Sequence, residues 1–538
     1  QRMYKAPLAD YQNLLTQYAG DHKDYDLATM QQILQTVGKF SQERLWPSNK
    51  IGDQEGIHYT PSEHSVSVPK DFHECYKIIC DNGYTATALD PKYGGGGGPW
   101  VLHHIISEML ASGNLSLSTC PMLTNGAVTT LIANASDSLK AQYIEPMVSG
   151  KFSGSMCLTE PQCGTDLGLI KTLAEPKDDH YLITGQKIWI TFGEHDLSDN
   201  IIHLVLAKTP NAPDTTKGIS LFLVPKYLPD GNRNPVFCGG VEDKMGQHAS
   251  PTAVLNFDKA QGWLVGEEFH GMKCMFEMMN PARIGVGVQG LAVSEAAYQL
   301  AFDFASQRRQ SRSLDPKQQD QEHTADIILV HPDIKRMLLI IESTNYAMRH
   351  LIAYCGYHQD QNNLDIVDLL TPIIKSYVTE QSLDNVSLAM QLMGGMGYVQ
   401  DGLCEQLYRD GRITMIYEGT NGIQALDLIG RKIAKDQGKS LMRLLKHLKP
   451  TKDIEALINQ ANTTLLQNTQ NPSTIAAIAP SYLKLLAISI QYCLITQDDH
   501  APDSLKTFYT DYILPETKLY LDQLQKGSSS LLDHQKYL

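Results

Sequence analysis

The chain reads CLTEPQCGTD over residues 157–166, where a strand-like run that begins near residue 153 ends in a turn of Pro, Gly and polar residues. Further short runs rich in Ile, Val, Leu and Thr follow, and they span residues 181–191, 201–207, 219–224 and 253–257. No helical period lies between these runs. The sequence therefore predicts a small antiparallel β-barrel or sandwich, which we place at residues 151–262.

Amphipathic helices are expected on both sides of this β region, because apolar residues there return every three or four positions. Residues 1–150 form the first helical region. After the β region, the predicted helices span residues 282–308, 333–355, 363–394 and 421–436. We therefore expect an α+β chain of several domains, with a C-terminal helical bundle at 263–436 and a helical extension at 437–538.

Composition excludes several classes of protein. The 538 residues suffice for about three or four domains, and 45 Lys plus Arg against 59 Asp plus Glu give a net charge of −14. This balance argues against nucleic acid or an anionic membrane as the main partner. The ten cysteines contain no C-x-x-C pair, so we expect no metal site and a reducing compartment. With no apolar leader and no apolar run of 18 residues, we expect a cytoplasmic protein without a transmembrane segment.

Two glycine-rich stretches resemble nucleotide loops only superficially. The run at residues 94–98 is not followed by Gly-Lys-Ser/Thr, which favours a mobile turn over a phosphate loop. Residues 285–290 read GVGVQG, but no strand precedes them, and Pro281 followed by Ala282 predicts a helix beginning there. We therefore expect these glycines to let a helix pack closely against another helix or a flat ligand.

Three widely separated stretches carry the chemical information. The first is residues 157–166 together with GQKIWIT at 185–191, the second is QLMGGMGY at 391–398, and the third is YRD at 408–410 followed by IYEGTN at 416–421. Each one alone has an ordinary structural reading. Together, in this order and with β structure between two helical regions, they resemble the acyl-CoA dehydrogenase family over roughly residues 60–430. The chain is most similar to the longer bacterial members with a C-terminal extension, a group that acts on 3-methylmercaptopropionyl-CoA as well as on ordinary fatty acyl-CoAs.

This resemblance implies an FAD-dependent α,β-dehydrogenation of an acyl-CoA to the trans-2-enoyl-CoA, with Glu418 as the base that removes the α-proton. Tyr417 and Gly419 flank this base and would contact the substrate. Arg283 matches an arginine near the active site, although a structural ion pair is an equal reading. Ala282 stands where some members carry the base instead, which strengthens the case for Glu418.

The resemblance also implies a set of FAD contacts. Around the flavin ring and pyrophosphate these are Leu158, Thr159, Thr165, Trp189 and Thr191. At the adenosine end, where the family uses the neighbouring subunit, they are Arg308, Gln391, Gly394, Gly395 and Thr420. Ser311 replaces the usual Phe after the arginine, so Arg309 is an alternative to Arg308, and Gly422 replaces the usual Gln.

Partners follow from the same resemblance. We expect an acyl-CoA substrate, either 3-methylmercaptopropionyl-CoA or a short or medium fatty acyl-CoA, and electron-transfer flavoprotein as the acceptor. A cofactor site shared between subunits implies a homodimer. The alternatives are an acyl-CoA oxidase that uses oxygen, a flavoprotein relative adapted to nucleic-acid binding, and a helical scaffold without activity.

Overall fold

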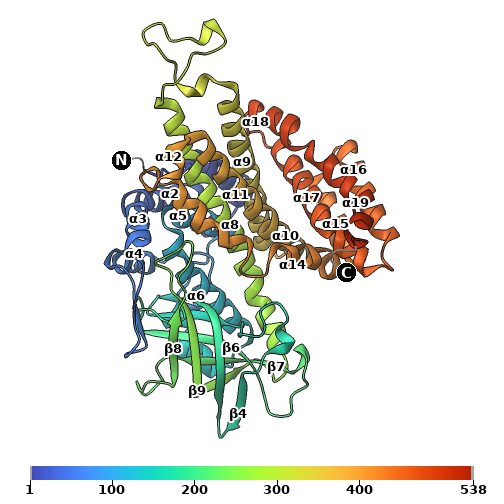
Figure 1. The fold of residues 1–538 in the computed structure, drawn as a ribbon. Coiled ribbons are helices and arrows are strands. Elements are labelled where there is room, and N and C mark those ends of the chain that lie inside the picture. The colour runs from blue at the N-terminus through green and yellow to red at the C-terminus, as the bar shows by residue number, and fades with distance from the viewer. Residues whose placement is uncertain (1–2, 535–538) are drawn as a thin grey trace. The chain divides into compact units, whose positions relative to one another are not determined.

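The computed structural model describes residues 3–534 and divides into two compact units. One unit spans residues 22–285, and the other combines residues 3–21 with residues 286–534. The long helix α8 (Gly271–Gln307) passes from the first unit into the second (Figure 1).

The first half of unit 22–285 is helical, as the hydrophobic spacing predicts. Its helices often begin at a side-chain cap: Asp26 accepts from the amide of Thr29, and Asn114 from that of Leu117. A short hairpin of β1 (His58–Thr60) and β2 (Ser65–Ser67) interrupts the helices and was not predicted. The helical segments are α2 (Leu27–Phe40), η1 (Ser41–Leu45), α3 (Trp46–Glu55), α4 (Lys70–Asp81), η2 (Pro91–Tyr93), α5 (Trp100–Gly113), α6 (Leu115–Asn134) and α7 (Asp137–Val148).

The glycine run at residues 94–98 is a packed segment rather than the mobile turn that its composition suggested. The amides of Gly95 through Gly98 donate to the carbonyls of residues 86–90, and the hydroxyl of Tyr25 donates to the carbonyl of Gly96 at 2.8 Å. The amides of the run thus find partners that single-sequence reasoning could not supply, because the partners come from tertiary folding.

The second half of the unit is a seven-stranded mixed sheet. Its strands are β3 (Phe152–Cys157), β4 (Leu173–Lys177), β5 (His180–Thr191), β6 (Asn200–Lys208), β7 (Ile219–Pro225), β8 (Val236–Val241) and β9 (Thr252–Val265), with the 3₁₀ turns η3 (Leu167–Leu169) and η4 (Thr216–Gly218) between them. The pairings β6–β4, β4–β5, β5–β9, β9–β7 and β7–β6 close a ring, so the expected barrel is present.

One part of the expectation was wrong, because the sheet is not wholly antiparallel. Strands β3 and β6 pair in parallel from Phe152↔Asn200 to Cys157↔Val205. The chain runs out through β4 and back through β5 between these two strands, so they enter the sheet in the same direction. Alternate residues of β6 face different layers: Leu204 packs in the core shared with α6 and α7, whereas Val205 packs inside the barrel.

Helix α8 contradicts the prediction of a helix beginning at Pro281. It begins at Gly271 and continues through Pro281, which lies inside it. A proline inside a helix removes one hydrogen bond and crowds the preceding turn, but tertiary packing of the largely buried turns that follow, from residue 282 onward, can stabilise the helix against this cost.

The second unit is entirely helical apart from its connections. Its elements before the extension are α1 (Leu8–Ala19), η5 (Pro316–Gln318), η6 (Ile328–Val330), α9 (Pro332–Asp360), α10 (Leu364–Ile373), η7 (Ile374–Val378), α11 (Thr379–Met393), α12 (Gly395–Tyr398), η8 (Gln400–Gly402), α13 (Cys404–Arg412), η9 (Ile413–Met415), α14 (Asn421–Asp427), η10 (Leu428–Ile433) and η11 (Ala434–Asp436). The stretch predicted as one helix at 363–394 is α10, η7 and α11, in which η7 is a π-helical turn.

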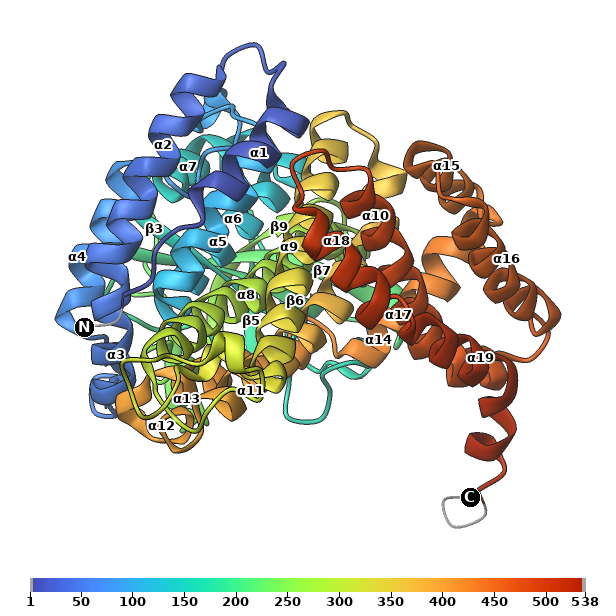
Figure 2. The same ribbon diagram turned by 90° about the horizontal axis from the view of Figure 1, so that it is seen from above.

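The extension consists of α15 (Lys439–Leu448), α16 (Lys452–Gln467), α17 (Pro472–Thr496), α18 (Asp503–Phe508), η12 (Tyr509–Ile513) and α19 (Glu516–Leu532). Within this unit, α17 lies beside α19 and against α9, as Figures 1 and 2 show. Among residues 3–534, α17 is the one helix long and apolar enough to cross a bilayer by length and composition. Its buried face and the ion pair from its Lys484 to Glu380, at 2.9 Å, identify it as a core helix of this unit.

Candidate active site

The proposed flavin residues of unit 22–285 converge on the end of β3 and on β5. The amide of Ile188 donates to the carbonyl of Thr159 at 2.9 Å, so the segment 158–159 lies directly beside residues 187–191. Leu158, Thr159 and Thr191 are each half-buried. The structure thus brings together four residues that the sequence separates by about 30 positions: Leu158, Thr159, Trp189 and Thr191.

Trp189 is presented by a β-bulge. The register of β5 with β9 shifts between Lys187 and Ile190, and Trp189 in that shift has φ of +63°. A left-handed conformation is strained for a bulky residue, and a bulge commonly re-aims a side chain next to a functional site. Trp189 is 56% exposed, whereas Ile190 beside it is buried. The arrangement therefore offers a flat aromatic face to a ligand.

A buried ion pair anchors this bulge. Lys187 is fully buried, and its Nζ lies 2.8 Å from Oε1 of Glu160 and 2.9 Å from the carbonyl oxygen of Leu158. Glu160 also accepts from the hydroxyl of Thr172 at 2.6 Å and from the amide of Lys171 at 2.7 Å. Burial alone would raise the pKa of Glu160, but the charge of Lys187 and these hydrogen bonds hold it at about 2. The pair therefore joins the β3 end, β5 and the segment before β4.

Thr165 lies on the exposed loop that follows β3. Glu160 and Cys163 form an isolated bridge, and the chain then leaves the sheet, so the hydroxyl of Thr165 lies in solvent-facing chain. An exposed hydroxyl on a loop beside the bulge suits contact with a polar part of a ligand.

The base candidate lies in the second unit, on the short loop between η9 and α14. Glu418 has φ of +59° and Gly419 has φ of +86°, so two successive residues adopt the left-handed conformation. The side chain of Gln424 donates to the carbonyls of Glu418 at 3.2 Å and Gly419 at 3.0 Å. These hydrogen bonds restrain the strained loop, so that the carboxylate of Glu418 is held in one place, as a general base requires.

The neighbours of Glu418 are placed as follows. The hydroxyl of Tyr417 donates to the side-chain oxygen of Gln289, which joins the loop to α8. Thr420 is exposed and forms the N-cap position of α14. Ile416 is 48% exposed on the face that carries the loop.

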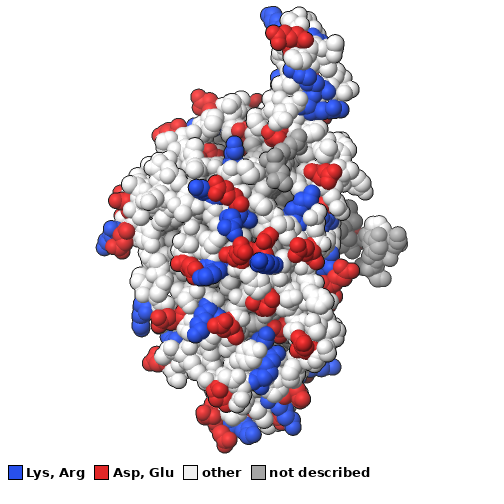
Figure 3. Space-filling view, turned by 90° about the vertical axis from the view of Figure 1, so that its left-hand side faces the viewer, with Lys and Arg blue, Asp and Glu red and all other residues white. Residues whose placement is uncertain are grey.

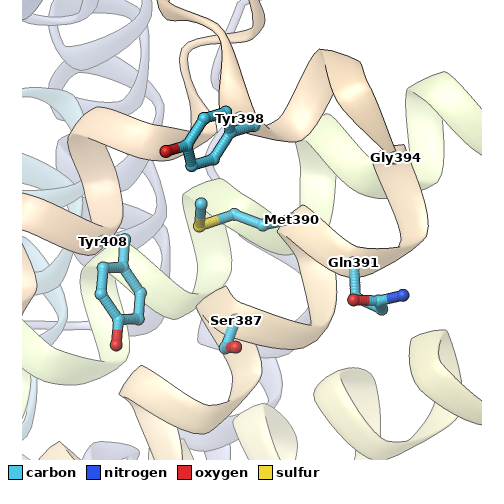
Figure 4. Close-up of a pocket in the computed structure, with 6 residues that line it drawn as sticks. All are labelled: Ser387, Met390, Gln391, Gly394, Tyr398 and Tyr408. Atoms are coloured by element: carbon cyan, nitrogen blue, oxygen red, sulfur yellow. The ribbon is translucent and has the colours of Figure 1, made fainter.

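A pocket of about 310 Å³ lies at the end of α11, lined by Ser387, Met390, Gln391, Gly394, Tyr398 and Tyr408. Figure 4 shows Tyr398, Met390 and Tyr408 turned toward the same space, with the Gln391 amide pointing away from them. Gly394 has φ of +59°, and a Cβ added at Gly394 or Gly395 would meet nothing within 4 Å. This open backbone, flanked by aromatic rings, fits the adenosine end of a dinucleotide.

The two arginine alternatives differ in their surroundings. Arg309 donates to the carbonyl of Ala325 at 2.9 Å and forms an ion pair with Asp320 at 2.7 Å. Arg308 is exposed at the C-terminal end of α8. These contacts favour Arg308 as the arginine available to a phosphate.

Arg283 is 98% buried within the α8 segment of unit 22–285. Burial of this kind is compatible with the structural reading as well as with the functional one. No group of three His, Cys, Asp or Glu side chains within residues 3–534 is arranged to hold a metal ion.

The sequence reasoning missed the residues that support the site from below. They are Lys187 and Glu160 under the flavin residues, and Lys375, Asn421 and Gln424 under the base loop. One signal was available for the lysines, because each is the one Lys, Arg, Asp or Glu of its strand or turn, and a lysine is rarely buried unless it has a specific partner.

Three family models match the chain: the N-terminal domain of acyl-CoA dehydrogenases at residues 28–151, the middle domain at 155–260, and the C-terminal domain at 270–434. The 3-methylmercaptopropionyl-CoA dehydrogenase of Ruegeria pomeroyi is 40% identical over 446 residues, which are 80% of this chain and 75% of that protein. A butyryl-CoA dehydrogenase of Syntrophomonas wolfei is 34% identical over 450 residues, 78% of this chain and 73% of that protein.

A solved structure shows the same fold across nearly the whole chain. The acyl-CoA dehydrogenase of Bacillus anthracis, complexed with FAD, aligns with a TM-score of 0.74 at 19% identity and covers 94% of this chain and 89% of that one. The shared architecture therefore includes most of the helical extension.

Proposed function

Because this chain belongs to the acyl-CoA dehydrogenase family, whose members are FAD-dependent oxidoreductases, we propose that it oxidises an acyl-CoA to the trans-2-enoyl-CoA with Glu418 as the base. The observation that carries this assignment is the anchored left-handed loop, which combines a carboxylate with the matching Tyr-Glu-Gly-Thr motif at residues 417–420.

The reaction removes two hydrogens from neighbouring carbons of the thioester. Glu418 takes the α-proton, while Tyr417 and Gly419 confine the reacting carbons beside it. Bound FAD supplies the acceptor for the β-hydride. Trp189 would cover the ring, Leu158 and Thr159 would contact its edge, and Thr191 would supply a hydroxyl that can donate or accept.

The remaining cofactor contacts are assigned to a second copy of the chain. Gln391, Gly394, Gly395 and Thr420, with Arg308, would hold the adenosine and phosphate end of the partner's FAD. The open backbone at residues 394–395 and the pocket beside it support this assignment. A homodimer is therefore the smallest complete enzyme that we propose.

The proposed substrate is 3-methylmercaptopropionyl-CoA, with a short or medium fatty acyl-CoA as the second candidate. The first follows from the 40% identity to an enzyme named for that substrate, and the second from the identity to a butyryl-CoA dehydrogenase. Initial rates with the purified enzyme on the methylthio substrate, butyryl-CoA and octanoyl-CoA would separate them. Highest kcat/KM for octanoyl-CoA would contradict the first choice.

We propose electron-transfer flavoprotein as the acceptor, in the cytoplasm, where ten unpaired thiols are stable. Reoxidation of the reduced enzyme tests the acceptor. Rapid turnover with oxygen alone, with peroxide as product, would identify an oxidase instead. On the face drawn in Figure 3, Lys and Arg alternate with Asp and Glu without a broad basic area, which gives no support to a nucleic-acid-binding role.

The assignment of the base is tested by Glu418→Gln. This variant should still bind FAD and acyl-CoA, but substrate added without oxygen should no longer bleach the flavin absorbance, because an amide cannot accept the α-proton. The matched control is Glu455→Gln, an exposed carboxylate in the first turn of α16, which should reduce its flavin at the wild-type rate. Flavin reduction at full rate in Glu418→Gln would contradict the assignment.

A further inference from the structure

The π-helical turn η7 places a buried lysine beneath the base loop. Lys375 is fully buried, and Ile374 and Tyr377 of the same turn are buried as well. Its Nζ donates to the carbonyl of Gly419 at 2.6 Å and to the side-chain oxygen of Asn421 at 2.9 Å. A buried ammonium is costly, so a position that retains one directs its charge at a specific acceptor. Here the acceptors include the carbonyl of Gly419, which follows Glu418, and the side chain of Asn421.

The loop above Lys375 needs such a restraint. Glu418 and Gly419 are both left-handed, and this conformation is strained for a non-glycine residue unless the surroundings enforce it. Gln424, also fully buried, donates to the carbonyls of both residues. The carbonyl of Gly419 therefore accepts from two buried donors, Lys375 of η7 and Gln424 of α14, and the carbonyl of Glu418 accepts from Gln424.

Asn421 completes the support. Its side-chain amide donates to the hydroxyl of Thr379 at 3.0 Å and to the carbonyl of Ser376 at 3.2 Å, while its oxygen accepts from Lys375. The first residue of α14 is thus fixed to η7 and α11 at the point where the loop ends. The position of the loop therefore depends on η7 and α11.

The glycines of α8 let η7 pack closely against α8 within the same unit. A Cβ at Gly287 would lie 2.4 Å from Cγ2 of Ile374, and one at Gly290 would lie 3.1 Å from Cα of Thr379. The backbone of α8 therefore packs directly on the turn that carries Lys375. This is the close helix packing expected from the GVGVQG motif, and it connects the motif to the base loop.

We propose that Lys375 is a positioning residue for the dehydrogenation: with Gln424 as second donor, it holds the loop that aims the Glu418 carboxylate at the α-carbon. The proposal rests on the proposed function, in which Glu418 is the base. It predicts that Lys375 affects proton abstraction without contributing to substrate or FAD affinity.

The test follows proton abstraction by itself. In 3-thiaoctanoyl-CoA a sulfur replaces the β-carbon, so the α-proton can be removed but no β-hydride can follow. The FAD-loaded enzyme is incubated with this probe in D₂O, and deuterium uptake at the α-carbon is measured by mass spectrometry. We expect Lys375→Met to lower the exchange rate roughly 100-fold, the scale of a displacement of about 1 Å at a reacting group. The dissociation constant of the probe and the FAD content should stay within twofold of wild type.

Two further variants separate positioning from folding. Lys375→Arg keeps a buried cation and should recover exchange to within about tenfold of wild type, which a loss of packing alone does not explain. Gln424→Met removes the second donor at similar volume and should also lower exchange at unchanged probe affinity. Lys432→Met is the matched control, because Lys432 lies in η10 of the same unit and its ion pair with Asp368, at 3.7 Å, does not touch the loop. It should exchange at the wild-type rate.

The outcomes decide the proposal in each case. Wild-type exchange in a folded Lys375→Met overturns it, and so does a loss of exchange that appears only together with a loss of FAD. If Lys375→Met does not fold, Gln424→Met decides, and wild-type exchange there overturns the clamp. Exchange at full rate in Glu418→Gln would instead overturn the proposed function, so the two failures are distinguishable.

Discussion

At the scale of single residues, two buried lysines that have no direct role in the proposed reaction support the candidate site. Lys187 pairs with Glu160 beneath the bulge of Trp189, and Lys375 binds the loop of Glu418. In each case a fixed charge lies behind a residue with a left-handed backbone. The strained residues are at least partly exposed, and the charges that support them are fully buried.

The Lys187–Glu160 pair predicts how stability depends on pH. The pKa of Glu160 is about 2 in the folded chain against an ordinary 4.5, so its contribution is complete above pH 4.5 and is lost as pH falls toward 2. At about 1.4 kcal/mol per pKa unit, this contribution is about 3 kcal/mol before any cost at Lys187. Urea unfolding of wild type and the double variant Glu160→Gln, Lys187→Met should therefore converge as pH is lowered from 6 to 3.

Glu455→Gln serves as the exposed control for this prediction and should follow the wild type at every pH. A stability gap between wild type and the double variant that stays constant down to pH 3 would show that the ionised pair does not account for it.

At the scale of elements, the period of the sequence identified most helices and five strands, but not the elements with little apolar signal. Strand β4 is LAEPK and β8 is VFCGGV, and both are ordered mainly by their partners β5 and β9. The prediction that a helix begins at Pro281 was also wrong, because the packing of α8 outweighs the local preference of proline. Conversely, the glycines of α8 were correctly assigned to close helix packing.

Helix α8 carries a test of that packing. Gly287→Ala would place a Cβ 2.4 Å from Ile374 Cγ2, so the helices must separate, and we expect a loss of about 1–3 kcal/mol in the free energy of unfolding. Gly430→Ala, in the exposed part of η10, would meet nothing within 4 Å and should be neutral or slightly stabilising. Denaturant melts of both variants check this, and equal stability of the two would rule out tight packing at Gly287.

At the scale of the whole molecule, the extension is part of the second unit rather than an appendage. Asp498, between α17 and α18, is 2% exposed and accepts from the hydroxyl of Tyr346 at 2.5 Å and lies 3.4 Å from Nε2 of His350. Tyr18 of α1 contacts the other ring nitrogen of His350 at 3.0 Å. Burial would raise the pKa of Asp498, but the neighbouring His350 ring and the hydrogen bond from Tyr346 hold it well below its usual range. One buried network thus joins α1, α9 and the extension.

This integration bears on the assembly. We expect a homodimer, because the extension covers a surface of the bundle and the proposed FAD site needs a second copy. Light scattering after gel filtration should give about 120 kDa, twice the 59.8 kDa of the chain. A mass near 240 kDa would indicate a tetramer and contradict the homodimer, and a mass near 60 kDa with bound FAD would contradict the shared site.

The family and the order of helical and β regions could be read from the sequence alone, because reacting groups must be particular residue types at particular spacings. What holds the motif residues in place became visible in the folded chain. The contacts of Lys375 with Gly419 and of Lys187 with Glu160 join segments 44 and 27 positions apart, and no local pattern records such pairs. The parallel pairing of β3 with β6 was hidden for the same reason. Burial and long-range pairing depend on the whole chain, whereas the motifs that indicate the reaction are short stretches of a few consecutive residues.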